Sequence, residues 1–227
     1  MNFKPIPNKF EYLNWQEIES IAKDKRSTVI WPFGAVEQHG PHLPLATDSI
    51  FVDEIISEVF KLFSPDIPLK KLPTQYIGFS PEHKAFAGTI SLSSNLLISI
   101  IKEVGVQLCD MGFKRLILIN AHGGQISLLN TAARELRSCA PNLSILPCFL
   151  WSGVDGLSKL LSKEELENGL HASLAETSLM LDLKPELVGD DRPCDIYEEK
   201  IPEGWSLEGN APTAWLTEDL SRSGVIG

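Results

Sequence analysis

The sequence predicts an α/β fold in which helices cover both faces of a mostly parallel sheet. Short apolar runs of strand length alternate with longer segments whose apolar residues recur at helical spacing. The run Thr28–Trp31 is apolar or β-branched throughout, which is typical of parallel strands that are buried on both faces. We find no internal repeat or low-complexity linker. The chain of 227 residues therefore suits one three-layer α/β/α domain spanning 1–227.

The first elements follow from apolar spacing. Residues 11–25 have the spacing of a surface helix, and 27–34 form a buried strand that ends at a proline and a glycine. Residues 48–63 return to helical spacing, and 69–77 are a weaker strand candidate. We expect a loop over 77–93.

The later elements repeat this alternation. A capping cluster at Ser93 opens a helix that Gly112 ends, and 115–119 form a strand of Leu and Ile. A sharp turn and a further helix follow, and then 144–151 form the fourth strand. The last helix covers 172–183, and the remainder, rich in Pro, Gly and acidic residues, is predicted to be irregular.

The net charge and the cysteine content indicate which binding partners and which cellular compartment to expect. The net charge of −10 and the pI of about 5.0 disfavour binding to phosphate backbones, so we expect no nucleic acid partner. No apolar run approaches the ~20 residues of a membrane span. The four cysteines form no Cys-x-x-Cys pair, and a reducing compartment fits them best. We predict a cytoplasmic protein without a membrane partner.

Acidic and histidine residues follow two of the predicted strands. Glu37 and His39 come shortly after the first strand, and His122 comes directly after the third. Ligands of parallel sheets bind beyond the carboxyl ends of the strands, so we expect these side chains to meet there. Residues two apart in an extended segment share a face, which places Glu37 beside His39. Asp48 begins the next helix, and its carboxylate can bridge two metal ions.

This set of nitrogen and oxygen donors predicts a metal centre. Zinc, manganese and iron accept mixed imidazole and carboxylate ligands, whereas calcium prefers oxygen. Each motif alone has an ordinary interpretation, as a hydrogen-bonded loop pair, a helix cap at Asp48 or a phosphate-binding turn over 120–124. His42 is more typical of a structural histidine than of a third ligand. The joint occurrence at matching strand ends favours the metal centre.

The motifs together resemble those of the creatininase (creatinine amidohydrolase) family. Residues 34–48 resemble its first motif, 120–125 its second and 171–178 its third, and 78–83 and 86–89 also fit. The similarity extends from about residue 10 to the end, with the motifs in order. The resemblance implies a dinuclear metal hydrolase on an α/β/α fold, assembled as a homo-oligomer and usually a hexamer. Because the family often continues past residue 227 with another helix, the prediction includes a chain truncated at its C-terminus.

The resemblance also implies ligands for two divalent ions, zinc, manganese or iron: Glu37 and His122 for one ion, His39 for the other, and Asp48 as the bridge. Creatininase has a glutamate two residues after the second-motif histidine, and this chain has Gly124 there. We predict that Glu176 replaces it. The alternative for Glu176 is a first-turn carboxylate that interacts with the helix dipole.

Catalytic and substrate-binding roles follow from the same resemblance. His171 matches the family's acid/base histidine, which protonates the leaving nitrogen while metal-activated water attacks the carbonyl. Its ordinary alternative is a hydrogen-bonded histidine at a helix start, and Glu176 is the second candidate acid. Ser80, Gly123 and Trp151 are weaker candidates for substrate contact, and a Trp that ends a strand is commonly part of the core.

Departures from the family pattern affect the predicted substrate. Gly123 and Gly124 stand where creatininase has tyrosine and glutamate, Leu170 replaces a glutamate, and 167–170 contain no Trp. Creatinine is therefore not the expected substrate. We predict a hydrolase of another amide, cyclic amide or formamide C–N bond, in a small non-peptide molecule or a small peptide. The alternatives are a non-catalytic metal- or ligand-binding protein on the same fold and a Rossmann-like domain, which the missing glycine fingerprint disfavours.

Overall fold

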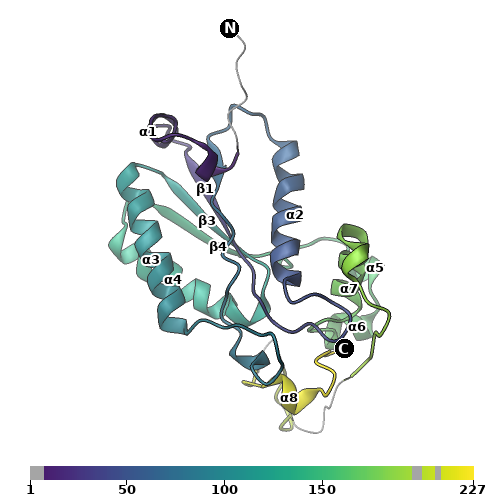
Figure 1. Cartoon of the computed structure of the whole chain (residues 1–227). Coiled ribbons are helices and arrows are strands. Elements are labelled where there is room, and N and C mark those ends of the chain that lie inside the picture. The colour runs from purple at the N-terminus through teal and green to yellow at the C-terminus, as the bar shows by residue number, and fades with distance from the viewer. Residues whose placement is uncertain (1–7, 196–200, 208–210) are drawn as a thin grey trace. The chain divides into compact units, whose positions relative to one another are not determined.

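The computed structural model describes residues 8–195, 201–207 and 211–227 (Figure 1). The chain separates into two compact units. We call the described part of 1–35, 48–79 and 92–152 the sheet unit, and 36–47, 80–91 and the described part of 153–227 the loop unit. The single domain expected from chain length stays a prediction.

The sheet unit contains four parallel strands in the order β2-β1-β3-β4, which confirms the predicted parallel sheet. The strands are β1 Thr28–Phe33, β2 Leu69–Lys71, β3 Arg115–Asn120 and β4 Ser144–Phe149. Every residue of the central strand β1 is buried, as its continuous apolar run predicts. Phe33 is paired with Asn120, so β1 and β3 end at the same level of the sheet.

Strand β2 is shorter than the predicted 69–77. Pro73 has no N–H to donate to a neighbouring strand, and the continuous ladder stops at Lys71. The chain contacts β1 again at an isolated bridge between Phe33 and Gln75. The N–H of Gly34 donates to the carbonyl of Gln75, which holds Gly34 beside the segment that follows β2.

The helices of the sheet unit form a layer on each side of the strands, with α3 and α4 on one side and α2 on the other (Figure 1). Their bounds are α1 Trp15–Ala22, α2 Thr47–Leu62, α3 Ser94–Met111 and α4 Ile126–Cys139. Ser93 caps α3 by accepting from Leu96 N, and Gly112 ends it at a φ of 101°. The core lies between helices and strands, with Phe33, Leu97 and Leu118 fully buried. Gly105 lets α3 approach Leu136 of α4 closely.

The loop unit has little regular structure. Its helices are α5 Leu157–Leu160, α6 Lys163–Asn168, α7 Leu174–Leu183 and α8 Thr217–Leu220, and its 3₁₀ turns include η2 Pro81–His83. The predicted helix 172–183 corresponds to α7, while α5, α6 and α8 fall where no helix was predicted. Antiparallel bridges join Val36 to Ile90 and His171 to Ile226. Among the described residues, no helix combines the length and apolar character that crossing a membrane requires.

Candidate metal centre

Two of the predicted ligands meet within the sheet unit. Asp48 lies in the first turn of α2, and His122 follows the end of β3. His122 Nδ1 lies 3.5 Å from Asp48 Oδ2, and both side chains are buried. The parallel sheet therefore brings together one residue from each of two distant segments, as the strand-end argument predicts.

Side-chain hydrogen bonds hold the turn that carries His122. Asn120 Oδ1 accepts from His122 N at 3.0 Å, and Asn120 Nδ2 donates to His122 O at 2.7 Å. Gln125 Nε2 donates to Asn120 Oδ1 at 2.9 Å and to Gly34 O at 3.0 Å. These bonds tie the ends of β1 and β3 together, so the backbone around His122 has little freedom.

The ring of His122 has the hydrogen arrangement of a metal ligand. Its Nε2 lies 3.0 Å from the backbone oxygen of Phe79, which can only accept, so the hydrogen is on Nε2. The neutral ring then has its lone pair at Nδ1, the atom that faces Asp48. Histidines that bind metals almost always donate their other N–H to a carbonyl or carboxylate in this way.

The loop unit contains a second group of predicted site residues. His39 Nε2 lies 3.9 Å from Glu37 Oε1 and 4.0 Å from Glu176 Oε2, so Glu37 and His39 do share a face. His39 Nδ1 lies 3.2 Å from the backbone oxygen of Glu37 and donates to it. In the neutral form of this ring the lone pair is at Nε2, which faces one carboxylate oxygen of Glu37 and one of Glu176.

His171 belongs to the same group. Its Nε2 donates to the backbone oxygen of Gln38 at 2.7 Å, and its Nδ1 lies 3.9 Å from Glu37 Oε1. The ring packs against those of His39 and His83, with centroids 4.3 and 4.1 Å away. Burial, together with the neighbouring His39 and His83, lowers the pKa of His171 well below its ordinary value. The resting ring is therefore neutral, and it has to accept a proton before it can donate one at Nδ1.

Glu176 shows features of both of its predicted roles. It lies in the first turn of α7 and accepts from Ala172 N at 2.7 Å, as a carboxylate that stabilises its own helix start does. It also forms a group with His39 and His171 in which the candidate ligand atoms lie within 4.8 Å of one another. Ala172 has a φ of 54°, an uncommon conformation for a non-glycine residue, and this turn sets His171 against the start of α7.

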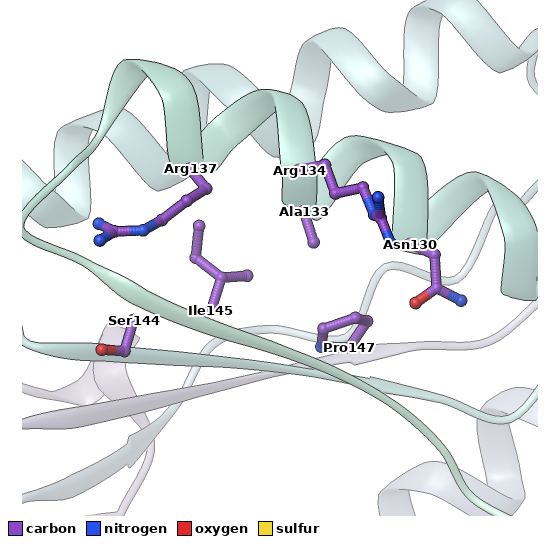
Figure 2. Close-up of a pocket in the computed structure, with 7 residues that line it drawn as sticks. All are labelled: Asn130, Ala133, Arg134, Arg137, Ser144, Ile145 and Pro147. Carbon is purple, nitrogen blue, oxygen red and sulfur yellow. The ribbon is translucent and has the colours of Figure 1, made fainter.

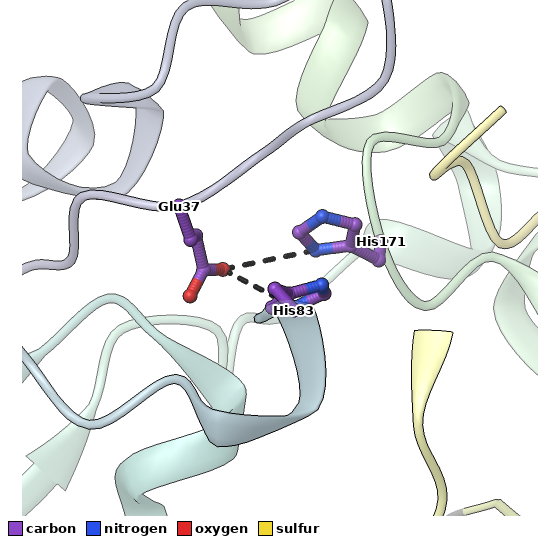
Figure 3. A group of neighbouring side chains, drawn as sticks. All are labelled: Glu37, His83 and His171. Carbon is purple, nitrogen blue, oxygen red and sulfur yellow. Dashed lines mark ion pairs between the residues drawn. The ribbon is translucent and has the colours of Figure 1, made fainter. Parts of the chain in front are cut away.

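His83 is a member of the group to which sequence reasoning assigned no role. It lies in η2, and its Nε2 is 3.5 Å from Glu37 Oε1 (Figure 3). Glu37, His83 and His171 form another group whose candidate ligand atoms lie within 4.8 Å of one another. The histidine stands in the family-like segment 78–83, and that motif was the one signal that could have drawn attention to it.

The remaining predicted residues lie in different places. Ser80 is buried and donates its N–H to Ser91 Oγ in the loop unit. Gly123 begins a 3₁₀ turn in the sheet unit, where Trp151 packs edge-on against Phe51 with centroids 6.0 Å apart. Their roles in substrate binding stay predictions. Thr177 Oγ1 lies 2.8 Å from Nε2 of His42, which supports the structural role predicted for that histidine.

A surface pocket of about 530 Å³ lies elsewhere in the sheet unit, between α4 and β4 (Figure 2). Its lining residues are Asn130, Ala133, Arg134, Arg137, Ser144, Ile145 and Pro147. None of them is an acid or a histidine, and the guanidinium of Arg137 already donates to the backbone oxygens of Ala140 and Leu143. The chemistry of a metal centre is therefore absent from this pocket.

Comparisons with known proteins agree with these motifs. A family model described as creatinine amidohydrolase matches residues 11–227. A mycofactocin precursor peptide peptidase of Mycobacterium tuberculosis (strain CDC 1551 / Oshkosh) is 30% identical over 204 residues, covering 87% of this chain and 70% of the relative. A creatinine amidohydrolase of Pseudomonas putida is 28% identical, covering 84% and 77%. A solved structure titled "Creatininase Mn" aligns with a TM-score of 0.72 and 25% identity, covering 96% and 92%.

Proposed function

Because the chain belongs to the creatininase (creatinine amidohydrolase) family, we propose that it is a metal-dependent hydrolase of a C–N bond. The family resemblance implies two divalent ions per chain. The proposed ligands are Glu37, His39, Asp48, His122 and Glu176.

One observation supports the metal more than any other. Three buried histidines each donate one ring N–H to a backbone carbonyl: His39 to Glu37, His122 to Phe79 and His171 to Gln38. In each ring the other nitrogen faces a carboxylate, at 3.5 to 4.0 Å. This arrangement fixes the tautomer and aims a lone pair, which is what a metal ligand requires.

The donor set suits two divalent ions of the first transition series. Imidazole and carboxylate together are accepted by manganese, zinc and iron. A related structure is titled as the manganese form, and we propose manganese or zinc ahead of iron for this chain. Asp48 is the proposed ligand that would be shared by both ions. One carboxylate can do this, because paired metal ions in hydrolases lie ~3.5–4 Å apart.

The proposed chemistry divides between the ions and His171. When bound, the ions polarise the substrate carbonyl and lower the pKa of water to about 7. His171 Nδ1 accepts a proton from the water that attacks the carbonyl carbon. It delivers this proton to the leaving nitrogen as the C–N bond breaks, so that the nitrogen departs as a neutral amine. Its hydrogen bond from Nε2 to Gln38 O holds the ring in the tautomer that this proton transfer needs.

The proposed substrate is a small amide, cyclic amide, formamide or short peptide. Relatives carry the names of a precursor peptide peptidase and of a creatinine amidohydrolase, both of which describe hydrolysis at C–N bonds. Glycines at positions 123 and 124 leave room where creatininase has larger side chains, so we propose a substrate other than creatinine.

By family resemblance we also propose that the protein assembles as a homo-oligomer, a hexamer. Light scattering tests this proposal.

Metal analysis joined to a substrate screen tests the proposal. Purified protein loaded with manganese or zinc should hold about two ions per chain, and Asp48→Ala should reduce that number. A screen of cyclic amides, formamides and short peptides should then show metal-dependent turnover. Metal binding without turnover of any class would favour a non-catalytic binding protein, and a single ion unaffected by Asp48→Ala would contradict the bridging role.

A further inference from the structure

The side-chain amide nitrogen of Gln38 lies close to one nitrogen of each of two histidine rings, those of His83 and His171. The two rings stack on each other in the loop unit. Gln38 Nε2 is 2.9 Å from His83 Nδ1 and 3.0 Å from His171 Nε2. The same nitrogen is 3.0 Å from the backbone oxygen of Gly224. Gln38 is 5% exposed, so these protein groups supply its hydrogen-bonding partners in place of solvent.

The orientation of this amide is determined by its oxygen. Gln38 Oε1 accepts from the backbone N–H of Gly40 at 2.9 Å. Because that N–H can only donate, the atom it meets is the amide oxygen, and the NH₂ group faces the rings. Gln38 therefore has two hydrogens to place among three neighbours.

The His171 ring cannot take either hydrogen. Its Nε2 is 2.7 Å from the backbone oxygen of Gln38, closer than the amide nitrogen, and a carbonyl only accepts. His171 Nε2 therefore bears the ring hydrogen. The two amide hydrogens of Gln38 are left for the oxygen of Gly224 and for Nδ1 of His83.

The His83 ring differs from the His171 ring in the nitrogen that it turns toward Glu37, which is the one that carries the hydrogen. Its Nδ1 accepts from Gln38, and the hydroxyl of Thr217, 2.6 Å from the same atom, can also donate to it. A hydrogen on Nδ1 could be accepted by Thr217 Oγ1, but the second amide hydrogen of the buried Gln38 would then face a ring nitrogen that cannot accept it. The neutral ring therefore carries its hydrogen on Nε2, 3.5 Å from Glu37 Oε1.

We infer that Gln38 is a positioning residue that gives the two stacked histidines complementary roles at Glu37. His83 presents an N–H to Glu37 Oε1, and His171 presents a lone pair at Nδ1 toward the same oxygen (Figure 3). His83 is then an N–H donor that faces the carboxylate at 3.5 Å, and not a metal ligand, although its ring lies within the donor group. The catalytic meaning rests on the proposed function, whereas the hydrogen positions follow from the contacts alone.

Nuclear magnetic resonance of the ring nitrogens tests the inference directly. Long-range ¹H–¹⁵N spectra of the full chain, labelled at histidine, are recorded metal-free and zinc-loaded at one pH. His83→Gln and His171→Gln assign the signals by their loss. We expect His83 to show an unprotonated Nδ1 and a protonated Nε2 in both samples, and His171 to show a protonated Nε2. A protonated Nδ1 on His83, or zinc coordination at its Nε2, would overturn the inference.

A variant of Gln38 tests whether its side chain determines the tautomer of His83. Gln38→Glu keeps the shape of the side chain but removes its N–H donors. The hydrogen of the His83 ring should then move to Nδ1, and the ¹⁵N shifts of Nδ1 and Nε2 should exchange. On a substrate from the screen, kcat should fall roughly 10–100-fold, the usual effect of losing an outer hydrogen-bonding partner. If Gln38→Glu leaves the His83 shifts unchanged, Gln38 does not set the tautomer.

Two further variants serve as controls. Gln125→Glu alters a glutamine of the sheet unit that is also buried and bonds to Phe79 N, Gly34 O and Asn120, so the His83 and His171 shifts should not change. Thr217→Val should also preserve the His83 tautomer, and inversion in this variant would assign control to Thr217 and overturn the inference. If Gln38→Glu fails to fold, the wild-type spectrum still decides the question. Correct tautomers in a protein that turns over no substrate would contradict the proposed function alone.

Discussion

The two groups of site residues are built by different means. In the sheet unit, Asp48 and His122 stand at the ends of regular elements, and their approach follows from the parallel order of β1 and β3. In the loop unit, His83 and His171 lie on short turns. The side-chain amide of Gln38 donates to His83, and His171 donates to the backbone oxygen of Gln38. The sheet unit therefore supplies two proposed ligands from regular elements, whereas the loop unit supplies the other proposed ligands and the proton-transfer histidine from turns and loops. Substitutions in the two groups should have different effects.

His122→Ala should have the largest effect, because it removes a proposed ligand from the rigid pair. We expect loss of bound metal together with loss of activity, exceeding the roughly 100-fold upper range for outer hydrogen-bonding partners. Elemental analysis and turnover on the same sample measure both. Full metal content with full activity would remove His122 from the centre.

His171→Ala should show the contrasting behaviour of the loop group. Because the ring is proposed to move a proton and not to hold metal, kcat should fall about 10²–10⁴-fold while metal content stays at the wild-type level. His171→Gln is the matched control for ring volume, and it should be equally slow. Loss of metal in either variant would make His171 a ligand, and undiminished turnover would pass the acid role to Glu176.

Asn14→Ala tests a part of the sheet unit that takes no part in the site. Asn14 Oδ1 accepts from Gln16 N and Glu17 N, and Glu17 accepts from Asn14 N, which completes a capping box on α1. The free energy of unfolding should fall by about 1 kcal/mol, as for other N-caps. Urea unfolding measures this change, while metal content should be unaltered. A change in bound metal would show that α1 affects the centre.

The smallest effect concerns Asp53, a carboxylate whose role is structural. It accepts from Thr74 and Tyr76 and pairs with Lys71 at 2.8 Å. The hydrogen bond to Asp53 raises the pKa of Tyr76 from 10.0 to about 12. The folded protein keeps this proton where the unfolded chain loses it, so the stabilisation is complete below pH 10 and disappears as the pH rises toward 12.

Urea unfolding between pH 9 and 12, compared with Tyr76→Phe, measures that contribution. The wild-type protein should lose stability relative to the variant across this range. Parallel curves for the two proteins would show that the hydrogen bond to Asp53 contributes nothing to the pH dependence.

The sequence predicted the sheet unit better than the loop unit for a physical reason. The continuous burial of β1 and the glycine at 112 leave clear patterns in the chain. Helix α6 is almost wholly polar, and α5 and α8 are single turns, so none shows apolar periodicity. Strand β2 is shorter than predicted because its apolar residues continue past Pro73, which has no N–H to donate to a ladder.

The site divides in the same way. Asp48, His122, Glu37 and His39 were found from strand ends and alternation, which are consequences of backbone geometry. His171 required a family resemblance, because no local pattern marks the residue before a turn. His83 and Gln38 were missed, since their roles depend on contacts between residues 45 and 133 positions apart, which single-sequence periodicity does not record.

The pairing of His171 with Ile226, and of Gln38 with Gly224, has a consequence for synthesis on the ribosome. The sheet unit contains no residue beyond 152, whereas the histidine group of the loop unit needs 224–226. At ~5–20 residues per second, those residues are translated roughly 4–15 s after the sheet unit is complete. A nascent chain can thus contain the whole sheet unit for several seconds before residues 224–226 are available to complete the histidine group.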